Sequence, residues 1–228
     1  SYGVSGATDG TGTAAKFKDP NSIAIGSDGN FFVSDFGNNT IRKITPEGIV
    51  TTFAGSGTAG SADGTGASAS FNYPQGLVVD SKNNIFVCDS ENNLIRKVTS
   101  EGVVTTFAGS GALGSNDSAT GTSATFRYPS GITIDSNDNL YISDYNNQKI
   151  RKITPEGVVS TFVGSGAIGQ SNGYKDAASF NYPKGLTVDN NENIYVADFH
   201  NSLIRKITPE GNVTTFAGFK LCMDCVYD

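Results

Sequence analysis

Four aspartates end apolar runs at regular intervals along the chain, and each is followed by an asparagine and then by an arginine. The four sets are Asp35, Asn38 and Arg42; Asp89, Asn92 and Arg96; Asp144, Asn147 and Arg151; and Asp198, Asn201 and Arg205. A carboxylate in that place can accept backbone N–H groups of the following turn or pair with the guanidinium. Because the sets are alike, we predict a structural role for them and not a catalytic one.

Other patterns could support catalysis or cofactor binding, but each lacks a necessary partner. His200 is the single histidine, so no Ser-His-Asp set can be assembled with independent support. Segments 55–60, 109–114 and 164–169 match Gly-x-Gly-x-x-Gly. The residues after them have no helical period, which a dinucleotide site requires. We therefore expect no catalytic residues, no cofactor and no enzyme activity.

The glycine-rich segments also carry side chains that could offer oxygen atoms to Ca²⁺. They are Asp9, Asp63 and the pair Asn116 and Asp117. A calcium site needs roughly six to eight oxygen ligands, and no segment has the Asp-x-Asp-x-Asp-Gly run. Turns formed by these side chains are the expectation, and no metal site is predicted.

The composition favours many short strands joined by tight turns. The 228 residues include 28 glycines, one methionine and no tryptophan. With 16 basic and 22 acidic residues the formal net charge is −6, the wrong sign for a surface that neutralises phosphates. We expect no nucleic acid as a partner. No run of about 18 apolar residues is present, so membrane insertion is not expected either.

Four similar units account for most of the chain. Phenylalanines in register lie 54, 55 and 54 residues apart, at Phe17, Phe71, Phe126 and Phe180. Each unit reads as four short runs separated by turns, and the seven prolines fall in turns or at the start of a first run. The predicted boundaries are a connector at 1–16, units with their connectors at 17–70, 71–125 and 126–179, a unit at 180–218, and a tail at 219–228.

A meander of four strands has two apolar faces and cannot bury both alone, so successive units must stack face to face. Curling such a stack about an axis removes its exposed ends. We predict an all-β propeller with four-stranded antiparallel blades. Its four units either close a small ring, which the near-integral count slightly favours, or form an arc of a longer array. An open arc would expose two apolar blade faces.

These residues resemble the NHL repeat, in which a strand ending in aspartate is followed by an asparagine and by a strand with Ile-Arg. The pattern covers all four units, over residues 17–218. The resemblance implies a propeller, typically of six blades. The histidine that names the family is replaced here, by Asn39, Asn93, Gln148 and Ser202. A turn position tolerates such replacements, so the expected fold is unchanged.

Aromatic side chains at the blade edges are the best candidates for binding a partner. In a propeller, the connectors between blades and the loop between the second and third strands emerge on one face. That face should collect Phe36, Tyr73, Tyr128, Tyr145, Tyr182, Phe199 and His200. Aromatic rings beside polar groups are favoured contact residues. Packing of the repeated tyrosines between blades is the alternative.

The resulting prediction is a non-catalytic scaffold for protein interaction or assembly. Its partner would be a protein, or another copy of the chain, bound through the loop face. Two alternatives stay open. A metal-dependent hydrolase or lyase propeller would gather ligands in the central channel. A structural subunit of an extracellular filament or matrix would instead bind copies of itself.

Cysteines and glycosylation sequons favour an extracellular or cell-surface protein. Cys88 replaces a serine or alanine of the other units and is predicted to be a small buried residue. Cys222 and Cys225 are candidates for a disulfide. Asn-x-Ser/Thr sequons make three asparagines candidates for glycosylation, namely Asn116, Asn212 and Asn38.

Overall fold

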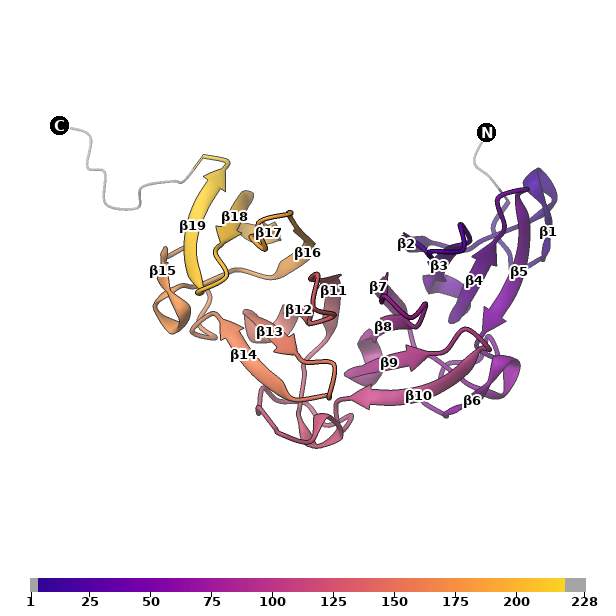
Figure 1. Ribbon diagram of the computed structural model, residues 1–228, viewed down its shortest axis with the longest axis horizontal. Helices are drawn as coiled ribbons and strands as arrows, with labels where there is room; N and C mark the ends of the chain where they lie inside the picture. The colour runs from indigo at the N-terminus through magenta and orange to yellow at the C-terminus, as the bar shows by residue number, and fades with distance from the viewer. Residues whose placement is uncertain (1–3, 220–228) are drawn as a thin grey trace.

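The computed structural model describes residues 4–219 as four antiparallel sheets, which follow one another along the chain (Figure 1). We call them blades 1 to 4. Blade 1 contains β2 (Pro20–Ile25), β3 (Phe31–Asp35), β4 (Thr40–Ile44) and β5 (Ile49–Ala54). Blade 2 contains β7 (Pro74–Val79), β8 (Ile85–Asp89), β9 (Leu94–Val98) and β10 (Val103–Ala108).

The last two blades repeat this order. Blade 3 contains β11 (Pro129–Ile134), β12 (Leu140–Asp144), β13 (Lys149–Ile153) and β14 (Val159–Val163). Blade 4 contains β16 (Pro183–Val188), β17 (Ile194–Asp198), β18 (Leu203–Ile207) and β19 (Asn212–Ala217). A proline begins each first strand, where its fixed φ is tolerated and a ladder donor is not needed. The predicted all-β fold with four meanders is confirmed.

A 3-10 turn joins the second and third strands of every blade. These turns are η2 (Phe36–Asn38), η4 (Ser90–Asn92), η6 (Tyr145–Asn147) and η8 (Phe199–Asn201). Each is followed by a residue in the left-handed region, with φ of 54° at Asn39, 56° at Asn93, 57° at Gln148 and 54° at Ser202. Asparagine tolerates that conformation better than most residues, which accounts for its use at the first two turns.

The glycine-rich connectors add a short fifth strand to the outer edge of three blades. These strands are β1 (Gly10–Thr11), β6 (Gly64–Thr65) and β15 (Gly173–Tyr174), which pair with β5, β10 and β19. In blade 3 a single bridge between Ser118 and Val159 takes that place. The 3-10 turns η1 (Gly12–Ala14), η3 (Gly66–Ser68), η5 (Gly121–Ser123) and η7 (Lys175–Ala177) follow. Each connector thus completes the blade that comes after it in the chain.

The core consists of three apolar layers, one between each pair of neighbouring blades. We call the side of a blade that faces the preceding blade its front face, and the opposite side its back face. Between blades 1 and 2, the back face of blade 1 contributes Phe32 and Ile41, and the front face of blade 2 contributes Phe71, Leu77 and Val87. Equivalent residues form the other two layers. Alternation along each strand supplies both faces with apolar side chains.

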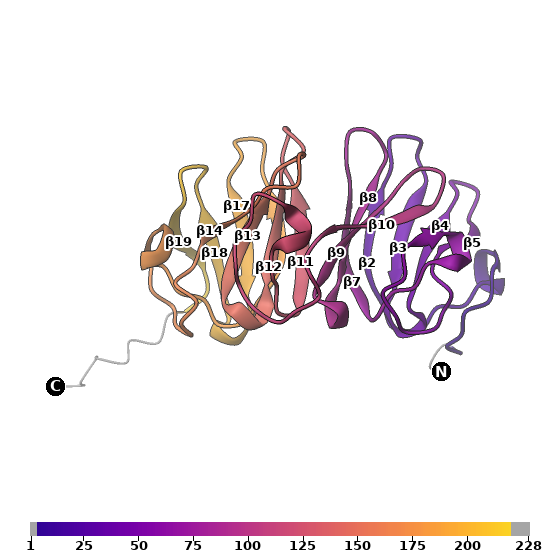
Figure 2. The ribbon, with the colours of Figure 1, turned by 90° about the horizontal axis from the view of Figure 1, so that it is seen from below.

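The four blades form an open arc and not a closed ring. Figure 1 shows blades 1 and 4 at the two ends of the arc, with the inner strands β2, β7, β11 and β16 on its concave side. Figure 2 shows the same four sheets from a perpendicular direction, standing side by side along the arc. Closure of a four-bladed ring, slightly favoured from the sequence, is therefore not what the structure has. Within residues 4–219, no helix is long and apolar enough to cross a membrane.

Candidate functional site

The repeated aspartate joins three segments of its own blade. Asp35 is fully buried, and its Oδ1 accepts the Lys18 N–H at 2.7 Å. Its Oδ2 accepts Asn38 Nδ2 at 2.8 Å and Arg42 Nη1 at 2.8 Å. The same three hydrogen bonds recur at Asp89, Asp144 and Asp198. We call each repeated aspartate, together with the asparagine and the arginine that it binds, a relay.

The arginine of each relay also binds a residue of the connector that precedes its blade. Arg42 is fully buried, and its Nη2 donates to Asp9 Oδ1 at 2.7 Å, while its guanidinium lies 5.0 Å from the centre of the Phe17 ring. The corresponding ion pairs join Arg96 to Asp63 and Arg151 to Asp117. In blade 4 the neutral Asn172 accepts from Arg205 instead, at 2.8 Å. The acidic connector residues considered as calcium ligands therefore hold arginines.

Burial governs the electrostatics of the relays. It raises the pKa of Asp89 and of Asp144, in opposition to their hydrogen bonds and to the neighbouring arginines. Asp117 lies at the surface end of a relay. Its partial burial acts to raise the pKa, but hydrogen bonds from Thr161 and Arg151 outweigh that effect and lower it. The four repeated aspartates that end the second strands have no exposed surface, so a substrate cannot reach them.

The predicted aromatic residues lie together on one end of the blades. Phe36, Tyr145, Phe199 and His200 belong to the 3-10 turns, and Tyr73, Tyr128 and Tyr182 precede inner strands. Ring contacts link Phe36 to Tyr73 at 4.7 Å. A longer series runs Tyr128, Tyr145, Tyr182, His200 and Phe199, with centroid distances of 5.9, 5.0, 4.6 and 5.0 Å. We call these seven residues the aromatic face.

The two series are separated at the turn of blade 2. There Ser90 stands where the other turns have an aromatic residue, and its hydroxyl donates to the Pro129 carbonyl at 2.6 Å. The tyrosines are also tied to the preceding blade. Asn39 Oδ1 accepts the Tyr73 N–H at 2.9 Å, and Asn93 Oδ1 accepts the Tyr128 N–H at 2.8 Å. The residues that replace the family's histidine thus form hydrogen bonds from one blade to the next.

A polar hollow of about 360 Å³ lies beside the aromatic face. Its lining includes Phe36, Tyr128 and Tyr145, together with one polar residue from each inner strand. These four residues, which we call the polar layer, are Asn21, Gln75, Ser130 and Lys184. They also line the hollow next to it along the concave side. Ser130 Oγ is buried and has no hydrogen-bond partner within residues 4–219.

Sequence reasoning missed the polar layer, although a signal was present. The four residues directly follow the leading prolines, and they differ in every repeat while their neighbours are nearly constant. Two tyrosines beside them are neutral donors at pH 7. Burial raises the pKa of Tyr128, with a further contribution from Glu91, and burial also raises the pKa of Tyr145.

The remaining predicted residues lie in varied surroundings. Cys88 is fully buried, and burial raises the pKa of its thiol. Asn116 and Asn212 are exposed, whereas Asn38 Nδ2 donates to both Gly6 and Asp35. Cys222 and Cys225 lie outside the described residues. Among residues 4–219, no three His, Cys, Asp or Glu side chains come close enough together to hold a metal ion.

Meandering blades around one axis, with relays inside and loops at one end, define the chain as a β-propeller. The family model for the NHL repeat matches residues 17–44, 71–98, 126–153 and 180–207. The chain belongs to the NHL-repeat family, and all four predicted repeats are confirmed.

Known proteins share this sequence and fold over part of their length. Protein SUPPRESSOR OF QUENCHING 1 of Arabidopsis thaliana is 31% identical, over 71% of this chain and 16% of that protein. NHL repeat-containing protein 2 of Homo sapiens is 31% identical, over 60% of this chain and 21% of that protein. A Bacteroides thetaiotaomicron protein of unknown function matches in structure with a TM-score of 0.72 and 23% identity. That match covers 86% of this chain and 48% of the other. The chain thus spans less than a quarter of the two sequence relatives.

Proposed function

We propose that this chain is a non-catalytic interaction module that binds a protein partner through the aromatic face and the hollow beside it. The observation that carries the proposal is the grouping of seven aromatic side chains from all four blades at one end of the arc. Aromatic side chains that are partly exposed and surrounded by polar groups contribute most of the binding free energy at many protein interfaces.

The tyrosines of the aromatic face are placed against local backbone preference. Tyr73, Tyr128 and Tyr182 have φ of 54°, 57° and 54°, a conformation that bulky residues rarely adopt. In blade 1 the same position holds Asp19, with φ of 50°, and aspartate tolerates that region well. Strain of this kind costs roughly 1–3 kcal/mol per residue and occurs often at functional sites. The use of tyrosine three times supports a role beyond shaping the turn.

The polar layer supports recognition of a polar group that enters the hollow. Ser130 Oγ and the Tyr128 hydroxyl provide neutral hydrogen-bonding groups, and Lys184 provides a positive charge whose Nζ lies 5.3 Å from the Phe199 ring centre. The residues lining the two hollows include neither a carboxylate nor a thiol. This composition favours binding over acid, base or nucleophilic catalysis.

Binding experiments that compare the native chain with two variants test the proposal. Proteins of the source organism would be passed over the immobilised chain, and retained proteins compared with those held by a Tyr145→Ala, Phe199→Ala double variant. Tyr174→Ala is the control, since Tyr174 is an exposed tyrosine on the outer edge at β15. A purified partner should bind the control normally and the double variant roughly 10-fold to 100-fold more weakly. Equal affinity for all three chains would refute the aromatic face as the binding site.

Titration with divalent metals separates this function from the hydrolase or lyase alternative. A metal ion held in the channel would raise the midpoint of thermal unfolding by linkage. We expect Ca²⁺ and Zn²⁺ to leave the midpoint unchanged. A rise that saturates with metal concentration and depends on polar-layer residues would favour the enzyme alternative.

We also propose an extracellular or cell-surface location, supported by the exposure of two sequons at Asn116 and Asn212. Expression through a secretory pathway should yield chains whose mobility increases after glycan removal. The Asn116→Gln variant should lose part of that shift. Asn38 should stay unmodified, because a glycan would break its hydrogen bonds to Gly6 and Asp35. Absence of glycan at both exposed sequons would count against the proposed location.

A further inference from the structure

Each inner strand has a β-bulge at the point where it meets the polar hollow. Pairing with the second strand loses its regular register between Pro20 and Ser22, Pro74 and Leu77, Pro129 and Ile132, and Pro183 and Leu186. The four residues of the polar layer lie inside these irregular stretches. A bulge redirects a side chain from the face that strict alternation would give it, and bulges are frequent beside functional sites. The fold thus presents one polar side chain of each blade to the hollow.

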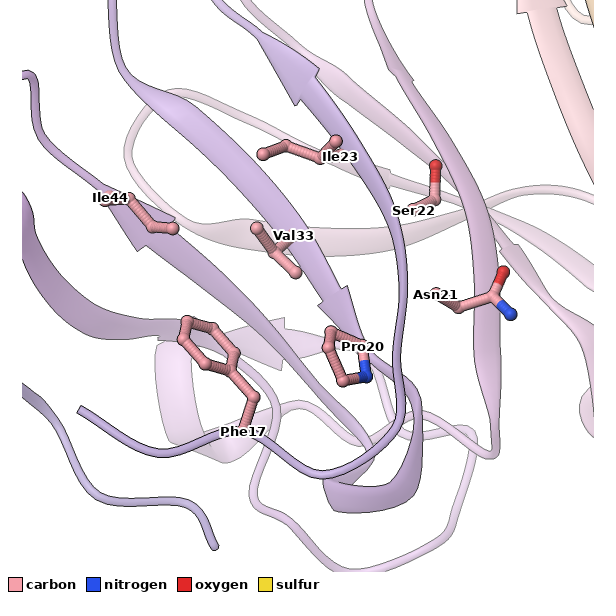
Figure 3. A pocket seen from close by; sticks show the side chains of 7 residues that line it. All are labelled: Phe17, Pro20, Asn21, Ser22, Ile23, Val33 and Ile44. Carbon is pink, nitrogen blue, oxygen red and sulfur yellow. The ribbon is translucent and has the colours of Figure 1, made fainter. Parts of the chain in front are cut away.

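Blade 1 shows the redirection clearly. In Figure 3 the Asn21 amide points away from Phe17, Pro20 and Val33, which line the apolar surface of the same blade. Asn21 also lines the polar hollow, together with the equivalent residue of every other blade. Because the bulge recurs while the side chain changes, these four residues set the chemistry of the hollow.

Lys184 gives the hollow its charge. The residues that line the polar hollow and the hollow next to it include no other charged side chain. Lys184 is exposed, its Nζ lies 5.3 Å from the centre of the Phe199 ring, and none of the ion pairs within residues 4–219 involves it. Glu91 helps burial to raise the pKa of Tyr128, yet Glu91 is not among the lining residues. Although the chain has a net charge of −6, the lining of this hollow is positive.

Ser130 adds a hydroxyl that can donate without giving up an existing hydrogen bond. Its Oγ has no hydrogen-bond partner within residues 4–219, and the residue is 4% exposed. Ser130 lines both hollows. Buried polar groups are nearly always paired, so this hydroxyl gains more from a ligand than a hydrated one would. Because Oγ has no exposed surface in the free chain, a ligand atom reaches it after a small movement of the lining side chains.

We propose that the polar hollow binds a carboxylate of the protein partner, with Lys184 as the cation and Ser130 as a hydroxyl donor. This inference rests on the proposed function, in which the aromatic face binds the surrounding surface of the same partner. An ammonium can only donate hydrogen bonds, and an ammonium beside a hydroxyl suits the two acceptor oxygens of a carboxylate. The lining residues contain no carboxylate of their own that would compete for Lys184.

A carboxylate fits the hollow better than a phosphate does. One lysine balances the single negative charge of a carboxylate, whereas a phosphate monoester carries roughly −1.5 to −2 at pH 7. Phosphate sites often use the bidentate fork of arginine, and no arginine lines either hollow. A glutamate or aspartate side chain and the carboxyl end of a chain both offer the same group, and the experiment distinguishes these sources.

Small peptides of known charge test this inference by NMR on the whole chain. The probe is acetyl-Gly-Glu-Gly-amide, and the reporters are the side-chain amide signals of Asn21, Gln75 and Asn146, which line the hollow. We expect saturable shifts of these signals. The matched acetyl-Gly-Gln-Gly-amide should bind at least about 10-fold more weakly, because hydrogen bonds to a charged group are stronger. Equal affinity for the two peptides, or no saturable shift with the glutamate peptide, would overturn the inference.

Two further probes identify the source of the charge. Acetyl-Gly-Gly-Gly with a free carboxyl end offers only a terminal carboxylate. Tighter binding of this peptide than of the glutamate peptide would support the carboxylate and assign it to the end of a chain. Inorganic phosphate that binds more tightly than either peptide would overturn the carboxylate in favour of a phosphate.

Variants of the chain assign the binding to its residues. Lys184→Met should weaken binding of the glutamate peptide at least about 10-fold and leave the glutamine peptide unchanged, and Ser130→Ala should weaken the glutamate peptide about 3-fold. Lys18→Met is the control, because Lys18 is exposed just before β2 and does not line the hollow. An equal effect of Lys18→Met would show that the peptide senses only the overall charge, and would overturn the inference.

A purified partner separates this inference from the proposed function. We expect Lys184→Met and the Tyr145→Ala, Phe199→Ala double variant each to bind the partner more weakly than the native chain does. If only the double variant loses affinity, the aromatic face stands and the carboxylate is overturned. If the double variant binds normally, the proposed function itself fails, and with it the inference that rests on it.

Discussion

At the scale of single residues, each relay arginine is a buried cation that holds separate parts of one blade together. Arg96 is fully buried and donates to both Asp89 and Asp63, so its removal leaves two carboxylates without their cation. Breaking one side of a buried ion pair typically costs about 3–5 kcal/mol. Arg96→Met should therefore lower the free energy of unfolding by about that amount in urea titrations. Lys97→Met is the control, and a loss of similar size there would contradict this role.

The surface end of the relay predicts how stability depends on pH. Asp117 has a pKa below its ordinary value of 3.8, so ionisation of this group favours the folded chain. Its contribution is complete above that ordinary value and is lost as the pH falls through the lowered folded value. The stability difference between the native chain and Asp117→Asn should shrink below about pH 4. Urea titrations from pH 7 to pH 3 measure the free energy of unfolding of both chains. A difference between them that does not change with pH would count against the ionised pair.

The sequence predicted half of each relay and missed the rest. Asp89 and Arg96 were foreseen as a structural pair because they recur in every repeat at close spacing. The contact to Asp63 was not foreseen, since Asp63 lies 33 residues before Arg96 in a segment whose composition indicated only turns. The fold brings the two together through the connector. The polar layer does not stand out in the same way, because its four positions carry four different side chains and so form no repeated motif.

At the scale of elements, the inner strands of blades 2 and 3 require glycine where the next inner strand passes closest. Gly131→Ala should strongly destabilise the chain, because the added Cβ collides with the Lys184 carbonyl of the next strand. Gly185→Ala adds the same methyl group in an open place and should change the free energy of unfolding by less than about 1 kcal/mol. Thermal unfolding of the two variants makes the comparison. Similar losses in both would contradict the close approach.

The sequence predicted the main strands well and the connectors poorly. Alternating apolar residues and turn prolines placed the four strands of each blade. The two-residue strands β1, β6 and β15 contain glycine with threonine or tyrosine, and such short segments have no pattern of their own. They are strands only because the outer edge of a blade offers unpaired backbone groups.

At the scale of the whole molecule, the arc predicts unequal protection along the chain. Blades 2 and 3 are covered on both faces, whereas blades 1 and 4 are each covered on one. In a stack of repeats, local opening is easiest where fewer interfaces hold a unit. Native-state hydrogen exchange should therefore be slower in β8, β9, β12 and β13 than in β3, β4, β17 and β18. Uniform protection across the four sheets would contradict this prediction.

The sequence could not decide between a ring and an arc. Each repeat encodes its own blade and both of its apolar faces, but the angle between blades arises from packing across interfaces. The repeats that contain Phe71 and Phe126 are nearly identical in sequence, so neither indicates how many blades come before or after it.

The connector strands also bear on how the chain folds as a ribosome makes it. In blades 1, 2 and 4 the strand that completes the outer edge precedes the blade in the sequence, as β6 precedes β10. When the last long strand of a blade leaves the exit tunnel, every partner it needs within that sheet has already been synthesised. Each blade can thus complete its hydrogen-bond ladder without later residues of the chain, an order that suits folding from the amino-terminal end during synthesis.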